Sequence, residues 1–126
     1  MANQFLGKNH SISIGEAKKM IRKFREQKDA IVRDEHKGKH LLPHCESFDR
    51  SAFDKILQRE DCRGIRIYYG MKEDSQHVHA VIVGFDENGK DILPMGVVAM
   101  DGTDPVISDT SSPCPPYCPP PSDLSV

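Results

Sequence analysis

The stretch that decides the fold comprises residues 65–69, Ile-Arg-Ile-Tyr-Tyr, and residues 78–85, Val-His-Ala-Val-Ile-Val-Gly-Phe. The first run alternates, which places its two isoleucines and its second tyrosine on one face of a strand. The second run is dense in β-branched residues, which favour strands. Residues 86–89, Asp-Glu-Asn-Gly, follow, and Asn-Gly is a strong hairpin signal because it adopts positive φ at little cost. Together these segments predict an antiparallel sheet.

Two shorter segments extend the predicted sheet. Asp91 to Leu93 returns after the turn as a third strand, which Pro94 ends because proline cannot donate to a strand ladder. Residues 96–100 add a fourth short strand. The expectation is therefore a three- to four-stranded antiparallel meander.

Two helices are predicted before the sheet. Ser13 and Glu16 fit a capping box, which marks the start of a helix. Apolar residues then recur at helical spacing, and the helix is expected to end before Gly38; these residues are Ala17, Met20, Ile21, Phe24 and Ile31. A second, short helix is predicted over residues 49–59. Helices followed by a meander indicate an α+β fold with both helices packed on the sheet, and the expected core includes Phe24, Phe53, Ile67 and Ile82.

The composition changes near Thr103. Residues 105–126 contain seven of the nine prolines and five serines. Proline fixes φ and lacks an N–H, so this segment is expected to be extended, mostly as polyproline II. The predicted organisation is a flexible N-terminus at 1–12, an α+β domain at 13–102 and an extended Pro/Cys-rich tail at 103–126.

Two motifs carry a resemblance to other proteins. Residues 64–70 read Gly-Ile-Arg-Ile-Tyr-Tyr-Gly and residues 114–118 read Cys-Pro-Pro-Tyr-Cys. Over residues 13–126 the chain resembles a group of small uncharacterised bacterial proteins that share this strand and a Cys-Pro-Pro-x-Cys C-terminus. The resemblance implies a stand-alone bacterial protein. It implies no activity, so no functional residue is carried over from it.

The charge of the chain is unevenly placed. Residues 1–72 hold 16 Lys and Arg against 10 Asp and Glu, whereas residues 73–126 hold 1 against 9. The two parts either neutralise each other within one chain, or support head-to-tail association or an anionic partner. The net charge of −2 argues against nucleic acid as a partner. No apolar run approaches the ~18 residues of a membrane helix, and residues 1–10 lack the apolar core of a signal peptide. We expect no membrane insertion and a cytoplasmic location.

The tail cysteines Cys114 and Cys118 are the first candidates for chemistry. A cysteine in a proline-rich tail has little core to fill, and three intervening residues allow a small disulfide loop or two thiolates on one metal. His77 and His79 stand two apart at a strand start, so their rings point to one side. Imidazole and thiolate suit zinc, so these four residues form the metal-site hypothesis. The competing interpretation is that the cysteines are structural and the histidines are solvated.

Other cysteines and histidines give weaker signals. His36, His40 and His44, with Cys45 adjacent, would share a face only if the first helix continued past Gly38. Cys62 precedes a strand and is expected to be a buried small hydrophobe.

The remaining candidates concern a protein partner. No nucleophile elbow, phosphate loop or glycine-rich fingerprint occurs, so we expect a non-enzymatic role without a cofactor. Arg66 and Tyr68 point opposite to Ile65, and either line a binding surface or pair across strands. The tail can add contacts to a partner or to a second copy through its central residues Pro115, Pro116 and Tyr117. The leading hypothesis is a protein-interaction or assembly subunit that uses its tail, and the alternative is a metal-binding or thiol-redox protein.

Overall fold

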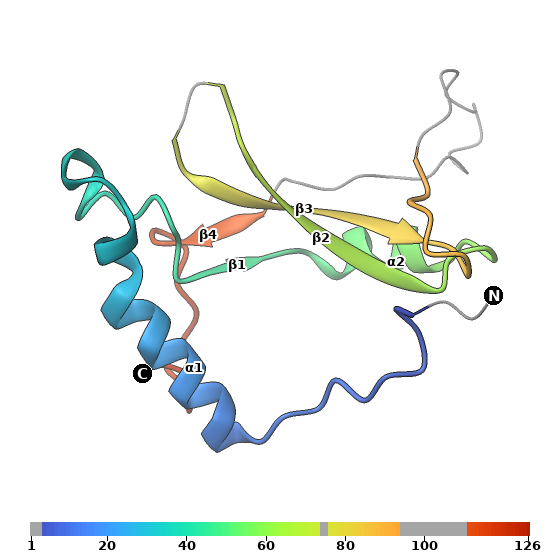
Figure 1. Ribbon diagram of the computed structural model, residues 1–126, viewed down its shortest axis with the longest axis horizontal. Coiled ribbons are helices and arrows are strands. Elements are labelled where there is room, and N and C mark those ends of the chain that lie inside the picture. Colours follow the sequence, from blue (N-terminus) through green and yellow to red (C-terminus); the bar gives the residue numbers. More distant parts are fainter. Residues whose placement is uncertain (1–3, 74–75, 94–110) are drawn as a thin grey trace.

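The structure is a computed structural model that describes residues 4–73, 76–93 and 111–126. Figure 1 shows a long first helix beside a twisted hairpin, with a second two-stranded ribbon behind it. The elements in chain order are α1 (Ile14–Gln27), the 3-10 turns η1 (Lys28–Ile31) and η2 (Asp34–His36), β1 (Cys45–Ser47), α2 (Arg50–Leu57), β2 (Gly64–Met71), β3 (Val78–Phe85) and β4 (Ser112–Cys114). Two helices with small antiparallel sheets confirm the α+β class.

The hairpin of β2 and β3 is the predicted pair of strands. Its register joins Gly64 to Phe85 and Met71 to Val78. The turn after β3 also has the predicted form, because Gly89 has a φ of 81°. The carboxylate of Asp86 accepts from the N–H groups of the turn residues Asn88 and Lys90, at 2.9 and 3.0 Å.

The predicted three- to four-stranded meander is wrong for the described residues, which form two separate two-stranded sheets. The return segment 91–93 makes a single bridge, Phe85 to Asp91, instead of a third strand. At this bridge Ile92 donates its N–H to the carbonyl of Gly84 at 2.9 Å, and the side chain of Asp91 pairs with Arg66 on β2. The predicted fourth strand at 96–100 lies outside the described residues.

The first helix starts as predicted and ends early. Ser13 caps it by accepting the N–H of Glu16 at 3.0 Å. The prediction that this helix includes Ile31 is wrong, because α1 ends at Gln27 and Ile31 belongs to the 3-10 turn η1. Its end coincides with Lys28, whose side chain turns inward and donates to the carbonyl of Leu42 at 2.9 Å.

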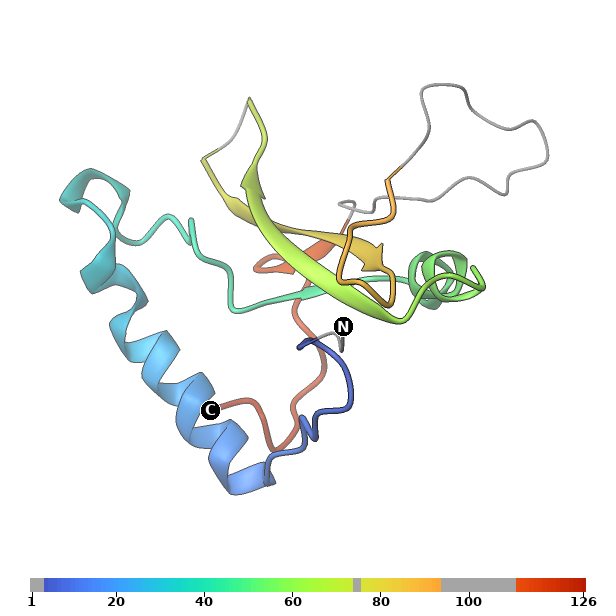
Figure 2. The same ribbon diagram turned by 45° about the vertical axis from the view of Figure 1, so that its right-hand side comes forward.

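The helices contribute unequally to the core. No residue of α1 is buried, and Met20 and Phe24 are 61% and 37% exposed. The expectation that Phe24 belongs to the core is therefore wrong, as Figure 2 illustrates: α1 stands off the hairpin. The second helix does pack, since a Cβ built on Gly84 would lie 3.0 Å from Ile56. The buried apolar residues are Ile56, Ile82, Val83, Phe85, Ile92 and Cys114.

The tail returns to its own chain and forms the second sheet. β4 pairs antiparallel with β1, so Cys45 lies opposite Cys114 and Ser47 opposite Ser112. Beyond β4 the chain runs toward α1 (Figure 1), where Arg25 donates to the main-chain oxygen of Val126 at 2.5 Å. Within the described ranges, no helix combines the length and the apolar character that crossing a membrane requires.

Candidate functional site

The hydrogen bonds of β3 show which residues of β2 direct their backbone N–H and C=O groups away from the hairpin. Val78 donates its N–H to the carbonyl of Leu41 at 2.7 Å, and Ala80 donates to the carboxylate of Glu46 at 2.7 Å. These two residues therefore direct their backbone groups away from β2. Since backbone direction alternates along an antiparallel strand, the intervening residues of β3 carry the ladder to β2.

The outer edge of β2 follows from this alternation. Tyr69 is in register with Ala80, and Met71 with Val78, so their N–H and C=O groups also point away from the hairpin. The outward residues of the strand are Ile65, Ile67, Tyr69 and Met71. Their backbone groups have no hydrogen-bond partner among the residues that the structure describes. An edge of this kind is a template for pairing with another strand.

Three of the four side chains at these positions are large and exposed, and Ile65 is half-buried. Ile67 is 51% exposed, Tyr69 79% and Met71 64%. The expectation that Ile67 is buried is therefore wrong, because its side chain borders two open cavities. Contiguous exposed apolar side chains commonly mark an interaction surface.

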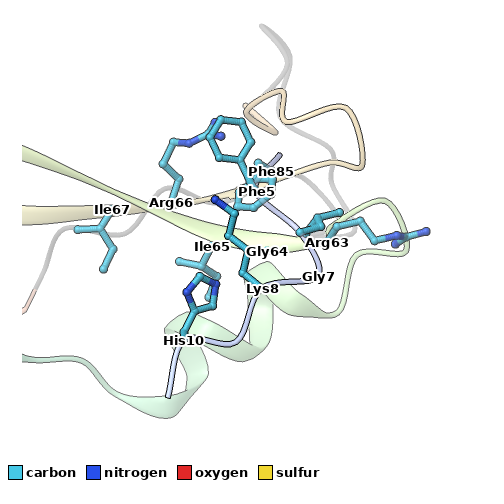
Figure 3. Close-up of a pocket in the computed structure, with 11 residues that line it drawn as sticks. Phe5, Gly7, Lys8, His10, Arg63, Gly64, Ile65, Arg66, Ile67 and Phe85 are labelled. Atoms are coloured by element: carbon cyan, nitrogen blue, oxygen red, sulfur yellow. The ribbon is translucent and has the colours of Figure 1, made fainter. Parts of the chain in front are cut away.

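A pocket opens beside the start of β2. Figure 3 shows the N-terminal segment, with Gly7, Lys8 and His10, passing near Gly64 and Ile65. The cavity between them has a volume of about 610 Å³. Its charged lining residues are Lys8, Arg63 and Arg66, and no carboxylate is among the residues that line it. The pocket is therefore bordered by cationic side chains, of which Arg66 is paired with Asp91.

Arg66 and Tyr68, both predicted to bind a partner, are engaged within the chain. Both donate hydrogen bonds to the carboxylate of Asp91, and Arg66 also donates to the carbonyl of Gly89 at 3.0 Å. The bond from Tyr68, together with Arg66, holds the pKa of Asp91 below its ordinary value. The same bond raises the pKa of Tyr68. This network fastens the turn after β3 onto β2.

The guanidinium of Arg66 has a second set of neighbours. It lies 4.7 Å from the ring centroid of Phe5 and 4.7 Å from that of Phe85. The two rings are themselves 5.8 Å apart in an edge-on arrangement. Stacking of this kind attracts a cation to the ring face, so Arg66 holds the N-terminal segment against the hairpin.

A second cavity, of about 430 Å³, also borders Ile67 and extends along β3. Its lining is mostly apolar and includes Phe24, Phe53 and Ile67. At its rim, Glu46 and His79 approach to 3.1 Å, with side chains only 10% and 14% exposed. Because Glu46 also accepts from β3, this pair joins β1 to β3. A carboxylate that orients an imidazole is also a common arrangement for acid–base work.

The tail residues form one small loop. Cys114 and Cys118 are joined by a disulfide with a Cα–Cα distance of 4.5 Å, which is one of the alternatives that their spacing allowed. Two cis peptide bonds, before Pro115 and before Pro116, lie inside the loop. Cys114 is 2% exposed, whereas Tyr117 is 65% exposed. The loop therefore presents Tyr117 to solvent from a buried anchor.

The predicted zinc ligands occupy separate places. His77 and His79 share one side, with ring centroids 6.5 Å apart, but His79 pairs with Glu46. The sulfurs of Cys114 and Cys118 are bonded to each other. Across the described ranges, no group of three or more potential ligands gathers around a common point.

Two of the loop histidines, His40 and His44, interact with the buried Lys28. Lys28 is 5% exposed, and its ammonium lies 3.1 Å from Nδ1 of His40. Burial lowers the pKa of Lys28. Burial also lowers the pKa of His44, with further contributions from Lys28, Arg25 and His40.

Sequence reasoning missed three of these features: the unpaired edge of β2, the Glu46–His79 pair and the burial of Lys28. The unpaired edge of β2 can be identified only once it is known which backbone groups of β3 bond to residues outside the hairpin. No local sequence pattern carries that information. The alternation over residues 65–69 does identify the side chains that line it. A scan against protein-family models and searches of curated proteins and of solved structures found no match to this chain.

Proposed function

We propose that this chain is a non-enzymatic assembly subunit that binds a second copy of itself through the outer edge of β2. The observation that carries the proposal is the row of outward N–H and C=O groups from Ile65 to Met71, which have no partner among the described residues. Strand addition satisfies such groups by main-chain hydrogen bonds. It requires a partner strand and no reactive side chain.

The sequence of β2 favours a second copy as that partner. Residues 64–70, Gly-Ile-Arg-Ile-Tyr-Tyr-Gly, are nearly symmetric about Ile67, with a glycine three residues away on either side. In a two-fold antiparallel pairing centred there, Ile67 faces its own copy and Ile65 faces Tyr69 of the second copy. Cross-strand aromatic and β-branched pairs of this kind contribute roughly 0.2–1 kcal/mol each. Two-fold contacts are also the commonest way in which identical chains associate.

Charge favours this register over the neighbouring one. A pairing centred on Ile67 sets Arg66 opposite Tyr68 of the second copy. A pairing centred on Arg66 sets two guanidinium groups directly opposite each other, which is destabilising. The cavity of about 610 Å³ beside Gly64 is the space that the end of the second strand would enter.

The tail has a supporting role in this proposal. β4 supplies the strand partner of β1, and Val126 is bonded to Arg25 of α1. Both contacts lie within one chain, so the tail would hold the subunit together. The exposed Tyr117, with Pro115 and Pro116 beside it, stays the predicted second contact surface for a partner.

Size-exclusion chromatography with light scattering tests the proposal on the full chain and on two variants. Ile67→Lys places two ammonium groups opposite each other at the two-fold axis. We expect association at least about tenfold weaker, or about 1.4 kcal/mol. Leu57→Lys is the matched control, because Leu57 on α2 is 52% exposed and Ile67 is 51% exposed. A wild-type monomer at every concentration, or a dimer equally insensitive to both variants, contradicts the proposal.

A further inference from the structure

Three of the four cysteines meet at the β1–β4 ribbon. Cys45 and Cys114 are directly opposite each other in its register, and Cys114 is bonded to Cys118. Opposite residues of an antiparallel pair project to the same face, with Cα atoms about 4.5 or 5.5 Å apart. A disulfide requires a Cα separation of about 4.4–6.8 Å. Cys114 is therefore within bonding reach of two cysteines.

The fourth cysteine lies elsewhere. The thiol of Cys62 donates to the carbonyl of Gly64 at 3.3 Å, and its sulfur would be 2.9 Å from a Cβ at Gly84. It therefore belongs to the packing under α2. Cys45 is the free cysteine at the ribbon, and it also lines the apolar cavity of about 430 Å³.

The two cysteines of the disulfide differ in their exposure to solvent. Cys114 is 2% exposed, whereas Cys118 is exposed. A thiol in solution therefore reaches Cys118, and attack on Cys114 requires a group already inside the ribbon. Cys45 occupies the position from which such an attack would come.

We propose that Cys45 and the Cys114–Cys118 disulfide form a thiol–disulfide exchange site. The Cys45 thiolate attacks Sγ of Cys114, and the Cys45–Cys114 bond forms as the Cys114–Cys118 bond breaks. The electron pair leaves on Sγ of Cys118, which takes up a proton from water to replace the one that Cys45 lost. One disulfide and one thiol exist before and after the step, so no oxidant or reductant is consumed.

The exchange moves the free thiol from the ribbon to the surface. In one state the thiol is on Cys45, facing a cavity, and the tail loop is closed. In the other state the thiol is on Cys118, and β1 is covalently joined to β4. The exposed thiol of Cys118 would then be available to a protein disulfide or to a low-molecular-weight disulfide. This inference does not depend on association through β2.

Disulfide mapping by mass spectrometry tests whether Cys45 and Cys114 are within bonding reach. Full-length Cys118→Ser is oxidised with glutathione disulfide and digested. We expect an internal Cys45–Cys114 disulfide as the main product, with two glutathione molecules released. Cys45→Ser with Cys118→Ser is the control, in which Cys114 has no partner at the ribbon. Glutathione adducts on Cys45 and Cys114, or a Cys45–Cys62 bond, would overturn the proposal.

Alkylation of the unsubstituted protein tests the exchange itself. The oxidised chain, with one disulfide, is treated with N-ethylmaleimide under native conditions. We expect label on Cys118 as well as on Cys45, and a loss of the Cys118 label in Cys45→Ser. The Cys62→Ser variant should retain both labels. Label confined to Cys45 and Cys62 overturns the exchange, even if the first experiment succeeds.

Discussion

Ile67 and Ile82 are directly paired across β2 and β3, yet Ile67 is 51% exposed and Ile82 is 1% exposed. The two side chains belong to the same face of one hairpin, because opposite residues of an antiparallel pair share a face. The β3 side is covered by α2 and by the segment that includes Ile92, whereas the β2 side is open. This asymmetry places the core of the subunit on β3 and its free surface on β2.

Truncation of the two isoleucines should separate these roles. Ile82→Ala removes a fully buried side chain and should lower the free energy of unfolding by about 2–5 kcal/mol. Ile67→Ala should lower it by less than about 1 kcal/mol in the monomer, because half of the side chain is already in water. Urea unfolding at low protein concentration measures both values. Equal losses would mean that Ile67 is as buried as its partner.

Proline substitutions should distinguish the residues of β2 whose N–H groups face outward from those whose N–H groups face β3. Ile67→Pro removes an N–H that has no partner among the described residues, whereas Tyr68→Pro removes one that faces β3. The Tyr68 variant should be less stable than the Ile67 variant by at least about 1 kcal/mol. Thermal unfolding of dilute protein gives the comparison. The reverse order of stability would show that the N–H of Ile67, and not that of Tyr68, bonds to β3.

Removal of Asp91 should loosen the turn after β3. Asp91→Ala leaves Arg66 and Tyr68 without their shared acceptor, and we expect a loss of about 1–3 kcal/mol. Asp54→Ala is the matched control, because its ion pair with Arg50 is exposed, with side chains 61% and 90% accessible. That control should change stability by less than about 0.5 kcal/mol. Chemical denaturation of both variants decides whether the Asp91 network stabilises the fold.

The loop around Lys28 should make stability depend on pH. Burial lowers the pKa of His44 from its ordinary value of 6.5, so the unfolded chain binds a proton more readily than the folded chain. Stability is therefore fully present above pH 6.5 and is lost as pH falls through the lowered pKa. His44→Gln should lose less stability than the wild type between neutral and mildly acidic pH. Identical pH profiles of the melting temperature would contradict this assignment.

The local features of the fold were predictable from the sequence. The capping box at Ser13, the alternation of residues 65–69 and the Asn-Gly turn each depend on neighbours a few positions away. The position of α1 was not predictable in this way, because its apolar stripe reads as a core face although Phe24 lines an open cavity.

Contacts between distant segments account for the other differences. The strands β1 and β4 have only three residues each, which is too short to show a period in the sequence. Their pairing also brings together residues far apart in the chain, such as Cys45 and Cys114. The Glu46–His79 pair likewise joins two residues that are ordinary surface types when read locally. The candidate zinc ligands were chosen by residue type and spacing. In the structure the two cysteines are bonded to each other, and His79 lies 3.1 Å from Glu46.

Amide hydrogen exchange along β2, followed by NMR at several protein concentrations, tests the central claim most directly. Arg66 and Tyr68 face β3, so their amides should be protected at every concentration and serve as an internal reference. The amides of Ile65, Ile67 and Tyr69 should exchange rapidly in dilute protein and become protected as the concentration rises, because a second copy then bonds to them. Rapid exchange of these three amides at every concentration would contradict assembly through the β2 edge.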